Sequence, residues 1–162
     1  MRRIRLEKVT LNIGCGTKTS TETAKTILER VTGTTAVITK THKRSTFGVA
    51  KNRPIGCKVT IRKGREEFLR RMLEAKENRL MKGSFDQTGN VSFGVKEYID
   101  VPQMDYDPKI GVLGFDVCVT LERPGYRVKK RKIASRIGKN HVIKKEEAVE
   151  FMKENFGVTI EE

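Results

Sequence analysis

The chain has 162 residues, which is enough for one ordinary domain with a sizeable core and too few for two large domains. It carries 34 Lys and Arg against 20 Asp and Glu, so its formal net charge is +14, which favours a polyanionic partner over a neutral small-molecule substrate. Hydrophobic residues make up 36% of the sequence, and this content argues against wholesale disorder.

The cysteines and the apolar runs indicate the compartment. Cys15, Cys57 and Cys118 are far apart and form no C-x-x-C pair, which argues against a zinc ribbon and against a disulfide framework. The apolar runs are too short for a membrane helix or for the apolar region of a signal peptide. We therefore expect residues 1–162 to form a single domain in a reducing compartment.

The first part of the chain predicts a strand followed by a helix. Residues 4–13 alternate apolar and polar side chains, and the apolar face of this predicted strand changes sides near Glu7. Apolar residues at helical spacing predict a helix over residues 22–31. Ser20 precedes this helix as a capping residue, and Gly33 ends it.

The middle of the chain adds two strands and a second helix. Residues 37–39 predict a short strand, and the alternation over residues 55–61 predicts another, with a basic connection between the two. Residues 65–80 carry apolar side chains on one helical face, so we expect an amphipathic helix that Gly83 closes.

The last part of the chain completes the expected fold. Residues 91–95 predict a strand that Tyr98 and Ile99 could continue, and residues 111–121 predict a final long strand. Residues 145–156 predict a short helix. The fold class predicted from this order is α+β, with an antiparallel sheet of the split β-α-β kind, helices on one face, and the other face left open.

Positive charge is concentrated in two segments without a single carboxylate. Residues 36–65 hold nine basic side chains and residues 123–145 hold ten. Because each close pair of like charges costs on the order of 1 kcal/mol in water, an anionic partner explains these segments better than a solvated face does, and nucleic acid is the favoured partner. Residues 82–122 are acidic by contrast, so a protein–protein scaffold within a ribonucleoprotein stays open as the alternative.

The residues form no convincing catalytic constellation, so we expect neither an enzyme nor a cofactor. The Gly14-Cys15-Gly16 segment lacks the rest of a nucleotide-binding motif and predicts a tight turn. A metal-dependent RNA-processing enzyme would need clustered carboxylates. The sole candidates are aspartates next to prolines, where turn formation is the simpler explanation: Asp100, Asp105 and Asp107.

Candidate RNA contacts follow from charge and from strand alternation. Residues 39–53 interleave cations with hydroxyl groups and one aromatic ring, Phe47, which could stack on a base or could anchor the loop in the core. Residues 123–145 are typical of an extended basic arm laid along an RNA backbone. The alternation turns Arg5, Lys58, Thr60 and Arg62 to the open face. The further candidates are Thr39, Lys40, Lys43, Arg44, Arg123, Arg127, Lys129, Lys130, Arg131 and Lys132.

Four segments in the same order resemble one family. LNIGCG at residues 11–16, TKTHKRSTFGVAKNRPIGCKVTIR at residues 39–62, GNVSFGVKEYID at residues 89–100 and YDPKIGVLGFDVCVTLERPGYRV at residues 106–128 are similar to large-subunit ribosomal protein five, the 5S-rRNA-associated family. The short N-terminus and the basic arm with IGKNHVI resemble its archaeal and eukaryotic branch.

This resemblance implies a structural constituent of the large subunit of the cytoplasmic ribosome. It implies binding to 5S rRNA in the central protuberance through the open sheet face, beside 23S-type rRNA and another 5S-binding protein. It also implies a loop near P-site tRNA and a bridge to a small-subunit head protein. By matching motif positions, the RNA surface would include Asn12, Thr34, Phe47 and Thr60, although Thr34 stands where bacterial members commonly have Gln, and the tRNA loop would include Lys51, Asn52 and Arg53.

Overall fold

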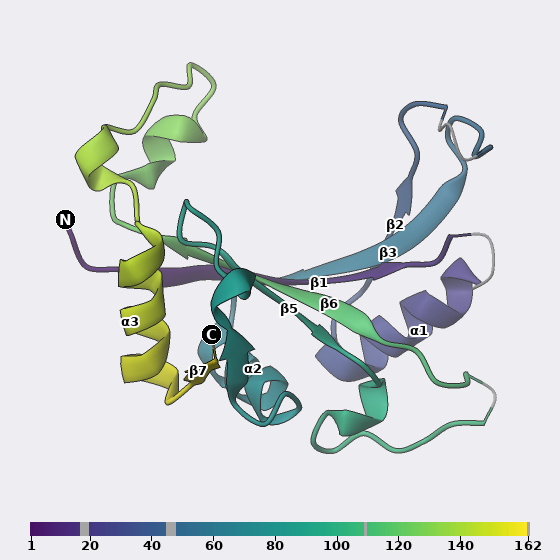
Figure 1. The fold of residues 1–162 in the computed structure, drawn as a ribbon. Coiled ribbons are helices and arrows are strands. Elements are labelled where there is room, and N and C mark those ends of the chain that lie inside the picture. The colour runs from purple at the N-terminus through teal and green to yellow at the C-terminus, as the bar shows by residue number, and fades with distance from the viewer. Residues whose placement is uncertain (17–19, 45–47, 109, 162) are drawn as a thin grey trace.

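The main sheet has five strands, and all its neighbouring pairs are antiparallel (Figure 1). The computed structural model describes residues 1–16, 20–44, 48–108 and 110–161. The strand order is β2-β3-β1-β6-β5. The bounds of these strands are Arg5–Gly14 for β1, Val37–Lys40 for β2, Pro54–Ile61 for β3, Val91–Val95 for β5 and Phe115–Glu122 for β6.

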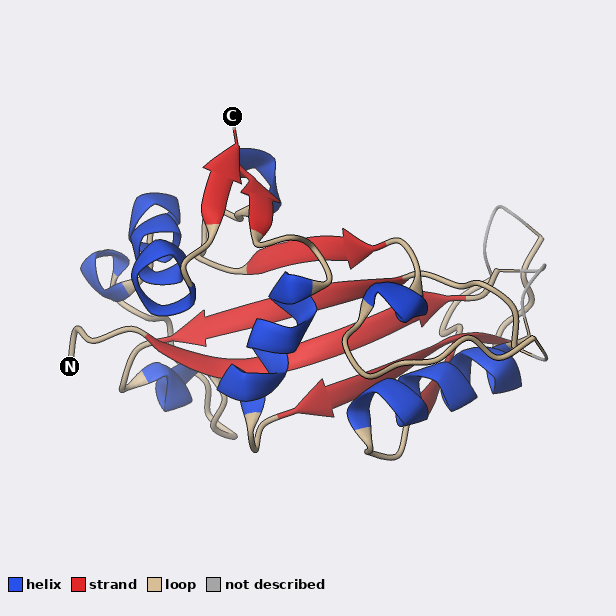
Figure 2. Cartoon of the chain, turned by 90° about the horizontal axis from the view of Figure 1, so that it is seen from below, coloured by secondary structure: helices blue, strands red, loops and turns tan. Residues whose placement is uncertain are grey.

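Two helices cover one face of this sheet, and the other face is open (Figure 1, Figure 2). Helix α1 (Thr21–Thr32) begins at Ser20, whose side chain accepts a hydrogen bond from the backbone of Glu22, and it ends at Gly33 in the left-handed conformation. Helix α2 (Arg65–Glu74) lies beside it and buries Phe68, Leu69, Met72 and Leu73. The predicted α+β architecture with one open face is confirmed.

The third helix and a small second sheet complete the fold. Helix α3 (Lys145–Phe156) lies at the end of the main sheet where the N-terminus enters (Figure 1). Strands β4 (Arg79–Met81) and β7 (Thr159–Glu161) form a separate parallel pair. Short 3-10 turns are η1 (Lys82–Ser84), η2 (Tyr98–Asp100), η3 (Tyr126–Lys129) and η4 (Lys139–His141). No helix in the described part of the chain has the length and apolar character needed to cross a membrane.

A β-bulge in β1 explains the change of apolar face that the sequence predicts near Glu7. Leu6 pairs with Leu121 and Lys8 pairs with Thr120, so Glu7 is the extra residue between them. Leu6 is buried before the bulge and Val9 after it, although residues three positions apart normally lie on opposite faces of a strand. The prediction is confirmed, and the bulge turns Glu7 away from the core.

Two predicted elements have different bounds in the structure. The second helix ends at Glu74, not at residue 80, because Glu77 and Asn78 adopt positive φ angles of 55° and 56° and direct the chain into β4. The last long strand begins at Phe115, not at residue 111. The prediction that Tyr98 and Ile99 could extend a strand is wrong, because these residues form η2.

Candidate nucleic-acid interface

The open face of the main sheet is lined by polar side chains that lie opposite one another on neighbouring strands. Asn12 of β1 lies between Lys58 of β3 and Asp116 of β6, and Thr10 lies between Thr60 and Cys118. The residues that alternate with them in sequence are buried against the helices. The face therefore offers hydroxyl, amide and ammonium groups in register, comprising Lys8, Thr10, Asn12, Thr39, Lys58, Thr60, Ser92, Asp116, Cys118 and Thr120.

A basic hairpin rises from one end of this face, between β2 and β3 (Figure 1). Thr41 organises its base, because its hydroxyl donates to the carbonyl of Ala50 at 2.7 Å and accepts from the backbone of Arg53 at 3.1 Å. Asn52 has a φ of 65°, a left-handed conformation that asparagine tolerates well. The predicted cations of the hairpin are exposed: Lys40, Lys43, Arg44, Lys51 and Arg53.

A second basic segment, the basic arm of residues 123–144, rises from the opposite end of the face (Figure 1). Its base is folded and not extended as predicted. Tyr126 is buried, and its hydroxyl donates to the carbonyl of His141 at 3.0 Å and accepts from the backbone of Ile143 at 3.0 Å. The two ends of the arm are therefore joined through one phenol. Arg127, Lys129, Arg131 and Lys132 remain exposed.

Arg123 differs from the expectation that it contacts RNA. Its side chain is only 6% exposed, and its Nη2 donates to Oε1 of Glu147 in α3 at 2.7 Å. The hydrogen bond from the Lys144 backbone, with a further contribution from Arg123, holds the pKa of Glu147 below its ordinary value, although burial opposes this shift. Arg123 therefore joins the arm to α3 and is not available to a phosphate.

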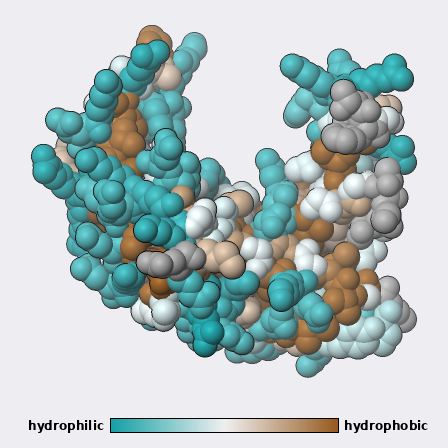
Figure 3. Space-filling view, in the orientation of Figure 1, coloured by the Kyte–Doolittle hydropathy of each residue, from teal (hydrophilic) through white to brown (hydrophobic). Residues whose placement is uncertain are grey.

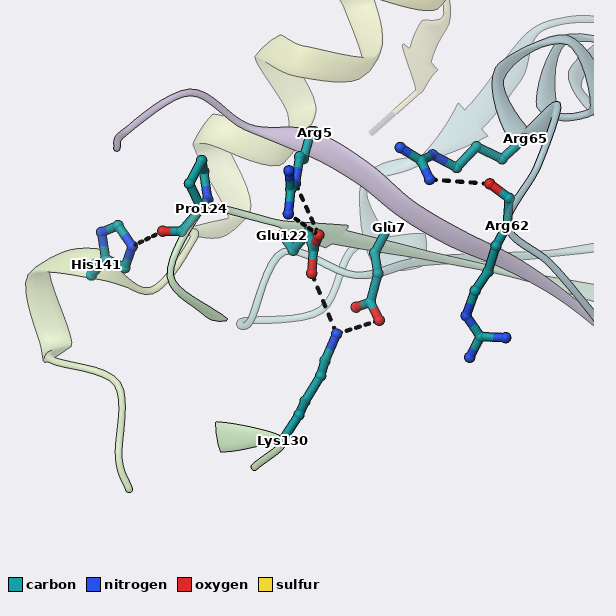
Figure 4. A network of polar contacts seen from close by, with 8 residues as sticks. All are labelled: Arg5, Glu7, Arg62, Arg65, Glu122, Pro124, Lys130 and His141. Atoms are coloured by element: carbon teal, nitrogen blue, oxygen red, sulfur yellow. Dashed lines mark hydrogen bonds and ion pairs between the residues drawn. The ribbon is translucent and has the colours of Figure 1, made fainter. Parts of the chain in front are cut away.

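Lys130 is held on the sheet by two carboxylates (Figure 4). Its Nζ donates to Oε1 of Glu7 in a short contact and to Oε2 of Glu122 at 3.3 Å. Arg5 Nη2 lies 2.7 Å from the other oxygen of Glu122. Burial acts to raise the pKa of Glu7, but the hydrogen bond and charge of Lys130 outweigh it, so the pKa is lowered. In the same view the Arg62 side chain extends to the same side of β1 as Lys130.

The hairpin, the open face and the arm together form a trough, defined here as the open face flanked by residues 40–53 and 123–144. Figure 3 shows this hollow between two hydrophilic walls. Both walls belong to the acid-free segments of the sequence. The molecule thus presents a concave, positively charged surface with a polar floor, a form that suits the backbone of a folded nucleic acid.

Alternative chemistry has little support in the described residues. No group of three or more His, Cys, Asp or Glu residues gathers there in a way that could hold a metal ion. Asp107, one of the aspartates considered for magnesium, pairs with Arg30 of α1 at 2.8 Å. Burial raises the pKa of the thiols of Cys15, Cys57 and Cys118, which disfavours the thiolate form that acts as a nucleophile or a metal ligand.

Comparison with known proteins identifies the family. Residues 54–151, more than half of the chain, match the family model that describes the C-terminus of the ribosomal uL5 family. The chain belongs to this family. It is 48% identical to the large ribosomal subunit protein uL5 of Sulfurisphaera tokodaii, with 100% of this chain and 94% of the relative covered. It is 49% identical to the uL5 protein of Sulfolobus acidocaldarius, with 99% and 92% covered.

Membership of the uL5 family, and similarity to its archaeal members, confirm the resemblance found in the sequence. The uL5 protein of Cenarchaeum symbiosum is a further relative, 46% identical with 99% of this chain and 97% of the relative covered. The family places no further constraint on the individual RNA contacts predicted here, so these remain predictions. Their positions in the structure nevertheless differ in kind.

The trough brings together most of the predicted contacts but not all of them. Thr34 follows the C-terminal end of α1, the helix that covers the opposite face of the sheet, and its hydroxyl donates to the carbonyl of Thr32 at 3.3 Å. Phe47 lies outside the described residues. Sequence reasoning did not select Lys8, Thr10 or Thr120, although the alternation within β1 and β6 carries the signal that turns them to the same face as Asn12.

Proposed function

We propose that the trough binds 5S rRNA in the central protuberance of the large subunit of the cytoplasmic ribosome. As a member of a ribosomal protein family, the chain has a structural role there and is not an enzyme. The observation that carries the proposal is the placement of two acid-free basic segments at opposite ends of one polar sheet face. Such a surface can follow a folded phosphate backbone without reading individual bases.

The floor and the walls of the trough have different tasks in this mechanism. Cations of the walls and Lys58 of the floor neutralise phosphates and release counterions, which supplies the salt-dependent part of the affinity. Asn12 and Thr60, which are half-buried in the floor, give hydrogen bonds that fix the register of the RNA. The described strands expose no aromatic side chain on this face, so stacking on single-stranded bases is not part of the mechanism.

The finer contacts of the family are carried over as part of the same proposal. Lys51, Asn52 and Arg53 lie near the outer part of the hairpin, and their exposure suits the proposed contact with P-site tRNA. The chain is also proposed to contact 23S-type rRNA, a neighbouring 5S-binding ribosomal protein, and a small-subunit head protein across an intersubunit bridge. These partners rest on the family resemblance and not on a contact in the structure.

A salt titration with a 5S rRNA transcript tests the proposal. We expect the affinity of the full chain to fall steeply with salt, and we expect Lys58→Ala to reduce the slope of log K against log salt by about 0.9 for one lost phosphate contact. Thr60→Ala should weaken binding with an unchanged slope. Lys153→Ala is the matched control, because Lys153 is exposed on α3 away from the open face. Salt-independent binding, or equal effects of Lys58→Ala and Lys153→Ala, would contradict the proposal.

A protein-scaffold role is the second candidate, and one observation favours it. Tyr106 and Val112, in the acid-rich segment before β6, are 54% and 51% exposed. Exposed apolar side chains near carboxylates suit a protein partner with basic groups. If this role dominates, the chain should stay attached to large subunits after ribonuclease treatment, whereas Tyr106→Ser should release it. Release by ribonuclease alone would favour the RNA-binding role.

A further inference from the structure

Two carboxylates lie at the arm end of the trough, where a polyanionic ligand should repel them. The side chains of Glu7 and Glu122 are each only 13% exposed, and both face the open side of the sheet. Without a partner they would oppose RNA binding. Both instead hold Lys130, and Glu122 also holds Arg5. Their position therefore calls for a role that offsets their repulsion of RNA.

The contacts of Lys130 connect the strands with the first turn of the arm. Its backbone nitrogen donates to the carbonyl of Arg127 at 2.9 Å, and the next residue, Arg131, donates to the same carbonyl at 3.1 Å. A turn of the arm is thus closed around the residue whose ammonium group reaches back to β1 and β6. The other anchors of the arm, Arg123 with Glu147 and the hydroxyl of Tyr126, join it to α3 and to itself. The carboxylates therefore attach the arm to the floor of the trough.

The β-bulge provides the geometry for this attachment. Glu7 is the extra residue of β1, and both it and Lys8 are half-buried while Leu6 and Val9 face the core. Glu122 is the last residue of β6, opposite Arg5. One carboxylate therefore comes from the bulge and the other from the end of the neighbouring strand, and Lys130 bridges them from above the sheet.

We propose that Glu7 and Glu122 are positioning residues that fix the basic arm as a preformed wall of the trough before RNA arrives. The inference rests on the proposed function of the trough. An arm that is already ordered loses less conformational freedom when RNA binds, so its exposed cations contribute more of their attraction to net affinity. Simple electrostatics makes the opposite prediction, because removal of a negative charge beside a polyanion should strengthen binding.

The test compares neutral variants of three acidic residues on the same face. Glu7→Gln and Glu122→Gln each remove one charge from the network. Asp116→Asn is the matched control, because Asp116 is exposed on the same face, six residues before Glu122 in β6, which corresponds to roughly 20 Å along the strand. Each full-length variant is titrated with a 5S rRNA transcript at several salt concentrations. Amide hydrogen exchange over residues 126–141 of the free protein reports the order of the arm.

The expected outcome is a difference in sign between the control and the network variants. Glu7→Gln and Glu122→Gln should weaken RNA binding roughly two- to fivefold, as expected for the loss of one partly exposed ion pair, and should speed exchange in the arm. Asp116→Asn should leave arm exchange unchanged and should bind RNA as tightly as the parent or more tightly. Glu122→Gln should have the larger effect, because it also releases Arg5.

Two failures of this experiment are distinguishable. If the parent protein does not bind the transcript, the proposed function fails. If the parent binds but the Glu7 and Glu122 variants bind equally well or more tightly, the positioning role is overturned. In the tighter case the salt slope should rise by about one, because the freed Lys130 would then contact a phosphate itself. Unchanged arm exchange in both variants would likewise overturn the proposal.

Discussion

The ion pair between Arg123 and Glu147 predicts an asymmetric response to mutation. Arg123 is the buried partner, with 6% of its side chain exposed, whereas the Glu147 side chain is 38% exposed. Loss of the glutamate leaves a charged guanidinium in a buried position, and Nε of Arg123 already has no hydrogen-bond partner there. Loss of the arginine leaves a carboxylate that water can reach and that still accepts a hydrogen bond from Lys144. The two deletions should therefore differ in free energy.

The magnitudes follow from these environments. Removing one partner of a buried pair costs about 3–5 kcal/mol, and the partial exposure of Glu147 places Glu147→Ala at about 3 kcal/mol, of which about 1 kcal/mol is the lost contact with the first turn of α3. Arg123→Met replaces the buried ion with an apolar side chain of similar length and should cost about 1 kcal/mol or less. The order is the reverse of what burial alone would suggest.

Urea unfolding of the two variants and the parent measures this difference. We expect the midpoint to fall clearly for Glu147→Ala and little for Arg123→Met, with unchanged slopes. In thermal unfolding, 3 kcal/mol corresponds to roughly 6–12 °C for a chain of this size. The reasoning is refuted if Arg123→Met destabilises the protein as much as Glu147→Ala does. Glu154→Ala, on an exposed position of the same helix, controls for the general effect of removing a carboxylate.

Three further predictions concern the arm, the sheet and pH. Tyr126→Phe removes a buried hydroxyl that joins two backbone groups, so it should cost about 1–3 kcal/mol and make the arm more sensitive to trypsin. Gly56→Ala would place a Cβ 2.4 Å from the carbonyl oxygen of Ile13, so it should cost about 1–3 kcal/mol in urea unfolding, whereas an unchanged midpoint would contradict the register. The pKa of Glu7 is lowered and that of Lys130 is raised in the folded state, so the stability that their pair contributes should be constant near neutrality. It should be lost as pH falls below about 4.3 or rises above about 10.4, and a pH series with Glu7→Gln should show no such loss from this pair.

Much of the fold could be predicted because local patterns and tertiary structure agree. The strands of the main sheet alternate between a buried and an exposed face, and the apolar shift near Glu7 marks the bulge directly. Helix α1 has both its caps written in the sequence, at Ser20 and Gly33. The open face followed from the same alternation, and the two acid-free segments located its walls.

The incorrect predictions arose from contacts between distant residues. Helix α2 ends early because the chain turns into β4, whose partner β7 lies about eighty residues later, and no local residue announces this parallel pairing. Arg123 was included among RNA contacts on charge alone, since its partner Glu147 lies 24 residues away. Thr34 was assigned by motif position, and its place after α1 depends on the packing of the whole sheet. Such assignments need the tertiary structure.

The bulge at Glu7 gives β1 a change of parity, and this has a consequence for insertions and deletions. In a regular strand, loss of one residue sends every side chain on one side of the gap to the opposite face. Removal of Glu7 would instead make Leu6 and Lys8 consecutive, as their partners Leu121 and Thr120 already are, so the neighbouring side chains would keep their faces. A one-residue deletion at Glu7 should therefore be tolerated better by the sheet than one elsewhere in β1.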